Sequence, residues 1–275
     1  LDLNTLDPGT TLPRRLTNDE YANSIKDLFG FDLPDQVIFP PEEEALGFDN
    51  NARALQATPL HAERYMYAAE LIAKAAVDDI DEQVPCTENE TSDQCLERFL
   101  DSIGARAWRR PLDVLEQAAL IELYRGAVDD GETHKDSVAL VITALLQSPS
   151  FLYRVEVGAE EGVQDGIVRL TNYEMASRLS YFIWRTMPDD ELFLAAENQE
   201  LLTDDGLANQ IDRMLQDPKA NDGFWHFFEQ WLHLDGVEKL VRDPRYYPDF
   251  DEESARAMKA DAKSFVEDAV WSAGG

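Results

Sequence analysis

Two stretches of this chain carry the same helix start signal, and this signal constrains the fold more than any other feature. Residues 15–22 and residues 169–176 both read Arg-Leu-Thr-Asn-x-Glu-x-Ala. Thr followed three residues later by Glu is a capping box, in which both side chains satisfy backbone N–H groups at a helix N-terminus. Apolar residues spaced for one helical face follow each box, which predicts helices after Thr17 and Thr171. The residues that capping does not require are also shared, and this favours two related helical halves.

Helix signals continue through the rest of the chain, whereas strand signals are scarce. Pro59 is suited to open a second helix, and residues 31–57 are too irregular, with Pro and Gly, for a long element. We expect a mainly α protein, a multi-helix bundle with at most a short β element near residues 151–170. Further helices are predicted at residues 96–108, after Pro111, and at residues 134–146, 189–197, 203–216, 220–234 and 251–271.

The same signals divide the chain into four regions, which we expect to form one compact unit. Residues 1–77 form an N-terminal helical region with a long Pro-rich loop, and residues 78–97 an acidic loop that contains both cysteines. Residues 98–168 form a middle helical region, and residues 169–275 a C-terminal helical region.

Charge excludes some classes of partner. The chain has 24 Lys and Arg against 55 Asp and Glu, which gives 24 − 55 = −31. Such a surface repels nucleic acid, because phosphate binding needs a basic stripe. The longest nearly apolar run, residues 138–146, is too short to span a bilayer.

The basic residues comprise 17 Arg and only 7 Lys. This balance leads us to hypothesise a salt-adapted, marine bacterial source, where salt screens the repulsion between acidic side chains.

Cys86 and Cys95 are the only cysteines, and eight polar residues separate them. A short polar loop lets two thiols meet, so we predict a disulfide between them. Two unpaired thiols in a cytosolic protein are the alternative. A metal site is less favoured, because no His lies nearby to complete four ligands. No Cys-x-x-Cys-His motif for covalent attachment of haem occurs, so we expect no cofactor in this chain.

Residues 224–235 combine aromatic side chains with His226 and His233. This stretch predicts one helix that lies mostly in the core, with the two histidines two turns apart on one face. That separation is too large for joint ligation of one metal, so no metal site is predicted. Glu229 follows His226 by three residues, a spacing at which the two side chains can pair.

Arg106, Arg109 and Arg110 form the most distinctive cationic cluster. In a chain this acidic, we interpret them as counterions of nearby Asp or Glu that fix helix ends. A site for an anion or a carboxylate ligand is the alternative. The familiar catalytic signatures, among them the P-loop, Gly-x-Ser-x-Gly and His-Glu-x-x-His, are absent.

Several segments occur in an order that carries a family resemblance. They are residues 12–21, Gly47-Phe48-Asp49-Asn50, residues 105–112, residues 146–154, residues 169–184 and Gln230-Trp231-Leu232. The chain resembles large secreted proteins of planctomycetes, myxobacteria and marine relatives, which consist of consecutive domains of unknown function and are often associated with c-type cytochrome modules. The resemblance implies a periplasmic or extracellular location, a haem elsewhere in the full-length protein, and a chain that is truncated at its C-terminus. It supplies no established catalytic residue.

Three functional hypotheses remain open. The first is a secreted or periplasmic helical module, not catalytic by itself, that scaffolds or docks a c-type cytochrome module or an extracellular polymer. The second is an enzyme of an unrecognised class that acts on extracellular polysaccharide. Its candidate groups are Asp49, Arg106, Arg109, His226 and Glu229, which would then converge in a cleft. The third is a calcium-dependent adhesion module that uses the acidic loops.

Overall fold

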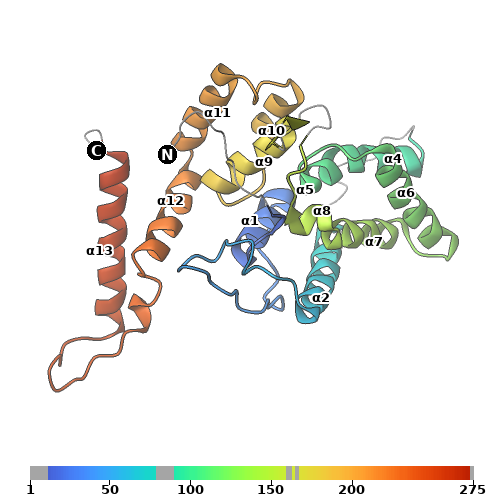
Figure 1. Ribbon diagram of the computed structural model, residues 1–275. Helices are drawn as coiled ribbons and strands as arrows, with labels where there is room; N and C mark the ends of the chain where they lie inside the picture. Colours follow the sequence, from blue (N-terminus) through green and yellow to red (C-terminus); the bar gives the residue numbers. More distant parts are fainter. Residues whose placement is uncertain (1–11, 79–89, 159–162, 165–166, 273–275) are drawn as a thin grey trace.

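The computed structural model describes residues 12–78, 90–158, 163–164 and 167–272. The fold is mainly α, as the helix signals predict (Figure 1). The α-helices are α1 (Asn18–Phe29), α2 (Pro59–Ala76), α4 (Ser92–Phe99), α5 (Ala105–Trp108), α6 (Val114–Asp129), α7 (His134–Gln147), α8 (Pro149–Leu152), α9 (Asn172–Ile183), α10 (Asp190–Glu197), α11 (Asp204–Gln216), α12 (Pro218–Trp231) and α13 (Glu252–Trp271). A π-helical turn at Leu100–Gly104 joins α4 to α5, and a 3₁₀ turn lies at Val237–Lys239.

The β structure consists of two short antiparallel pairs within the described part of the chain. β3 (Val163–Gln164) pairs with β4 (Ile167–Val168). β1 (Arg14–Arg15) pairs with β2 (Tyr153–Arg154), and Arg14 lies opposite Arg154 in the register. The predicted β element near residues 151–170 is therefore present. The first pair also joins the beginning of the described chain to the segment that follows α8.

Both predicted capping boxes are confirmed. Thr17 and Glu20 cap α1, and Thr171 and Glu174 cap α9, with the reciprocal hydrogen bonds in each case. The surroundings of the two starts differ, because the arginine before the first box is buried and the arginine before the second is exposed. The relation between two helical halves therefore stays a prediction.

The buried apolar side chains form two clusters. The first cluster lies among α1, α2, α4, α6 and α7, with the π-helical turn, α5 and α8, and it also includes Tyr181 of α9 and Met187. The second lies among α9, α10, α11 and the start of α12. Helices α12 and α13 lie side by side at one end of the molecule (Figure 1).

Polar contacts join α1 to the C-terminal region at the boundary between the clusters. Ser24 Oγ and Tyr181 OH share a hydrogen bond of 2.7 Å. Asp27 on α1 accepts hydrogen bonds from Thr186 Oγ1 and from Lys219 Nζ, each at 2.8 Å. These contacts fix α1 against α9 and α12, and they set the position of the cavities described below.

Two expectations for residues 220–234 are wrong. Helix α12 ends at Trp231, and His233 lies beyond it with a positive φ of 53°, so the two histidines do not share a helical face. The aromatic stretch is also not mostly core, because Phe227 is 47% and Trp231 56% exposed. Aromatic content indicates burial only when other elements cover the rings, and here the cover is partial: Phe48 stacks on Phe227 with ring centroids 5.7 Å apart, and the remaining surface of Phe227 and Trp231 stays exposed.

Cys95 is buried on α4. Cys86 lies outside the described residues, so the disulfide stays a prediction. Among the described residues, none of the helices combines the length and the apolar character of a membrane span.

Candidate functional site

Asp49 and His226 are brought together from distant parts of the chain. Asp49 lies in the loop between α1 and α2, and its Oδ2 is 2.9 Å from His226 Nε2 on α12. Arg185 Nη2, just after α9, is 3.9 Å from the same carboxylate oxygen. The contact therefore joins the N-terminal loop to two elements of the C-terminal region.

These groups line a cavity of about 250 Å³. The rings of aromatic residues form much of the lining. Its polar residues are Arg14, Thr17, Glu20, Asp49, Asn50, Arg185, His226 and Gln230. The lining aromatic residues are Phe48, Tyr181, Phe182, Phe224 and Phe227. The hydroxyl groups of Thr17 and Tyr181 at this cavity are already engaged, in the α1 cap and with Ser24.

Opposing effects act on the pKa of Asp49. Burial by itself raises this pKa, but hydrogen bonds from His226 and Gln230 and the charges of His226 and Arg185 lower it overall. The net shift is downward, so Asp49 is a carboxylate at neutral pH and serves as an acceptor rather than as a proton donor.

A second carboxyl group lies in the same cavity. Burial raises the pKa of Glu20, and the nearby charges of Arg14 and Arg185 and the N–H of Thr17 oppose that rise only in part. Arg154 Nη2 lies 3.8 Å from Glu20 Oε1. The carboxyl groups of Asp49 and Glu20, whose pKa values shift in opposite directions, thus lie close to the same group of arginines.

Glu42 belongs to the same polar region. Its Oε1 accepts hydrogen bonds from Asn18 N at 2.9 Å and from Arg15 Nη2 at 3.3 Å. Burial raises the pKa of Glu42 to about 7, despite the lowering effects of Arg15 and the Asn18 N–H. The ordinary pKa of a Glu is about 4.3.

The pKa of Glu42 predicts a specific pH dependence of stability. A carboxyl group with a higher pKa in the folded state holds its proton more tightly when folded, so its contribution falls as pH rises from about 4.5 to about 7. Over that interval, the unfolding free energy of the parent should fall relative to Glu42→Gln by about 1–3 kcal/mol. Urea titrations at a series of pH values measure the difference. Exposed Glu44→Gln is the matched control, and identical pH curves for the two variants would contradict the assignment.

Arg106 and Arg109 do not reach this cavity. Arg106 donates to the carbonyl of Asp27 at 3.0 Å, and its Nε lies 3.4 Å from Asp190 Oδ1. Arg109 is buried, and its guanidinium donates to the carbonyls of Ser150 at 2.6 Å, Phe151 at 3.1 Å and Tyr153 at 2.9 Å. Arg109 therefore holds the segment that leads into β2.

The counterion interpretation of the arginine cluster holds for two of its members. Arg106 pairs with Asp190, and Arg110 pairs with Glu116 at 2.7 Å near the start of α6. Arg109 is the exception, because its hydrogen-bond partners are mainly backbone carbonyls and not Asp or Glu. Sequence spacing does not reveal such a role, since carbonyl groups occur at every position.

Glu229 does not pair with His226 as the i, i+3 spacing allows. Its Oε1 accepts a contact of 2.6 Å from Lys259 on α13, and Lys259 also lies 3.5 Å from Glu238. His226 instead points to Asp49. Of the five candidate residues, the structure brings together Asp49 and His226, and it places the other three in contacts between elements.

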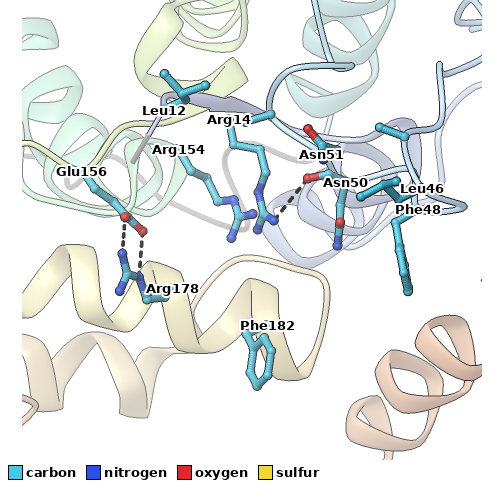
Figure 2. A pocket seen from close by; sticks show the side chains of 12 residues that line it. Leu12, Arg14, Leu46, Phe48, Asn50, Asn51, Arg154, Glu156, Arg178 and Phe182 are labelled. Carbon is cyan, nitrogen blue, oxygen red and sulfur yellow. Dashed lines mark hydrogen bonds and ion pairs between the residues drawn. The ribbon is translucent and has the colours of Figure 1, made fainter. Parts of the chain in front are cut away.

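A larger cavity adjoins the first. It has a volume of about 640 Å³ and shares Arg14, Phe48, Asn50 and Phe182 with the Asp49 cavity. Figure 2 shows its lining, in which the guanidinium groups of Arg14 and Arg154 lie next to each other. No sequence pattern marks either arginine as a site residue. The pairing of β1 with β2 brings Arg14 and Arg154 together, and the sequence alone does not predict this pairing.

Among the described residues, no group of three or more His, Cys, Asp or Glu is placed to hold a metal ion. Most of the acidic loop, residues 79–89, lies outside the described residues, so the calcium hypothesis is untested there.

The architecture is that of a mainly α protein in which the Asp49 cavity lies where the N-terminal and C-terminal regions meet. Comparison with known families divides the chain into three tandem domains. Residues 14–78 match the family described as PSD3, protein of unknown function (DUF1587). Residues 95–156 match PSD5, protein of unknown function (DUF1595), and residues 170–275 match PSD4, protein of unknown function (DUF1592).

These matches confirm the resemblance to proteins built from consecutive domains of unknown function. Neither a curated protein nor a solved structure matches the chain. The Asp49–His226 contact joins the first matched domain to the third.

Proposed function

We propose that the chain is a helical docking module, not catalytic by itself, within a larger secreted or periplasmic protein. The observation that carries the proposal is the dispersal of the candidate residues. Three of them use their polar groups in contacts between elements of the fold, namely Arg106, Arg109 and Glu229. A catalytic site requires such groups to converge on a substrate, whereas a scaffold requires them to fix its shape.

The negative charge of the chain favours binding to a basic partner. A net charge of −31 attracts a positively charged protein surface and speeds its encounter at low salt. A c-type cytochrome module with a basic face is the partner that the family resemblance favours. A neutral extracellular polymer is the other candidate, and for it the exposed rings of α12 supply apolar contact area.

Docking is tested by mixing the purified chain with a basic c-type cytochrome and measuring the heat of binding at low and high salt. We expect saturable binding at low salt that weakens as salt rises, because screening removes the charge attraction. An unrelated globular protein of similar negative charge is the control. If the cytochrome binds the control protein as tightly as it binds this chain, or if it does not bind this chain at low salt, the cytochrome is not the docking partner.

The Asp49–His226 pair supports a second candidate, an enzyme that acts on extracellular polysaccharide. A carboxylate that orients an imidazole at 2.9 Å inside a cavity is a recurring element of acid–base sites. We expect the purified chain to release no new reducing ends from neutral or acidic polysaccharides. If the parent chain does release reducing ends, and Asp49→Asn lowers the rate of release at least about 100-fold, the chain is an enzyme and the docking proposal is wrong. Glu229→Gln, which lies outside the pair, is the matched control.

A further inference from the structure

Two arginines face each other across the small β1–β2 pair. Arg14 and Arg154 are Cα partners in this antiparallel register, so their side chains leave the same face of the ribbon. In Figure 2 the two guanidinium groups lie side by side. Like charges directly opposite each other on antiparallel strands are destabilising unless an anion offsets them.

The protein offsets these two charges only in part. Glu20 Oε1 lies 3.8 Å from Arg154 Nη2, which is longer than a hydrogen bond. Arg154 is 9% exposed, and its Nε and Nη2 have no hydrogen-bond partner among the described residues. Arg14 Nη1 donates at 3.4 Å to the carbonyl of Asn50. A buried guanidinium that lacks acceptors costs free energy, and an oxyanion that binds beside it offsets its charge.

A third arginine on the cavity wall is already neutralised. Arg178 on α9 forms a two-point ion pair with Glu156. The pair at Arg14 and Arg154 is therefore the region of excess positive charge in this cavity, on a chain that is otherwise strongly acidic.

The rest of the lining is apolar or carries amides. Phe182 is 79% exposed and Leu46 94% exposed, and both border the cavity together with Phe48. Asn50 and Asn51 add amide groups next to Arg14. The cavity of about 640 Å³ has room for a ligand with one charged head and a ring or apolar body.

We propose that this cavity binds a small organic anion whose carboxylate or sulfonate head lies between Arg14 and Arg154 and whose apolar ring packs on Phe182. Guanidinium groups match planar carboxylates with paired hydrogen bonds, and they also stack on rings. A long polyanion is a poor fit, because the net charge of −31 repels it outside the cavity. The inference goes beyond docking, and either proposal can fail while the other stands.

The test titrates the full chain with benzoate and, separately, with its neutral analogue benzamide, and it follows amide chemical shifts by NMR. We expect benzoate to give saturable shifts near residues 46–51 and 178–185, and benzamide to give none. Benzenesulfonate distinguishes the head groups, and its binding in place of benzoate would assign the site to sulfur oxyanions. Equal shifts with benzoate and benzamide would overturn the proposal.

Two variants locate the site. Arg14→Gln should weaken benzoate binding at least about tenfold, and Phe182→Ala about threefold. Arg14 is half-buried and Phe182 is exposed, so both variants should fold, which the unshifted part of the spectrum checks. Arg53→Gln and Phe265→Ala remove a matched charge and a matched exposed ring from outside the cavity, and they should bind as the parent does. Unchanged affinity in Arg14→Gln would overturn the assignment.

Discussion

Replacing Arg109 by Ala is expected to lower the free energy of unfolding by about 3–5 kcal/mol. The guanidinium is buried and donates to the carbonyls of Ser150, Phe151 and Tyr153, which are left without this donor in the variant. Arg109 has a positive φ of 59°, and Ala keeps the Cβ, so the cost of the left-handed backbone does not change. Urea unfolding followed by circular dichroism measures the loss.

The neighbouring Arg110→Ala is the matched control. Arg110 pairs with Glu116 at a partly exposed position, where a salt bridge contributes about 1 kcal/mol or less. Arg109→Lys should recover little, because one ammonium cannot reach the set of carbonyls that a guanidinium fork spans. Equal losses in Arg109→Ala and Arg110→Ala would show that the carbonyl contacts contribute nothing beyond a surface ion pair.

Replacing Gly223 by Ala is expected to cost about 2–4 kcal/mol, because the new methyl group would force α12 away from α9. A Cβ at this position would lie 2.1 Å from the carbonyl oxygen of Ile183, which is backbone and cannot rotate away. The shift would also move His226 relative to Asp49. The variant should therefore lose both stability, measured by urea unfolding, and the NMR signature of the His226 contact.

Gly126→Ala serves as the control for that change. Gly126 also lies within a helix, and nothing lies within 4 Å of a Cβ built there. Ala is the better helix former, so this variant should gain up to about 1 kcal/mol. A loss in Gly126→Ala as large as that in Gly223→Ala would contradict the close approach of α12 and α9 as the cause.

The sequence predicted the helices well because their start signals are local. The boxes at Thr17 and Thr171 depend on side chains within three residues of the backbone groups that they satisfy. Such contacts form wherever the helix forms, whatever surrounds it. The mainly α class follows from these signals, but several bounds do not: α4 begins at Ser92 and not at residue 96, α12 runs from Pro218 to Trp231 and not over 220–234, and the short helix α8 at Pro149–Leu152 was not predicted.

The candidate site was predicted only in part, because its contacts join residues far apart in the chain. The sequence relates Asp49 and His226 only to their own neighbours, whereas their mutual contact depends on how α12 packs over the N-terminal loop. No sequence pattern marks Arg14 and Arg154, for the same reason. Their opposition exists only because β1 pairs with a strand that follows it by more than a hundred residues.

The boundary between the two buried clusters has a consequence for how such a chain can change over time. Hydrogen bonds such as those of Asp27 with Thr186 and Lys219 fix distance and direction across the boundary, but they do not depend on the detailed packing behind them. A substitution away from the boundary therefore leaves these hydrogen bonds in place. The cavities at the boundary can alter their lining while both cores keep their shape, so a chain built in this way can acquire a new ligand without acquiring a new fold.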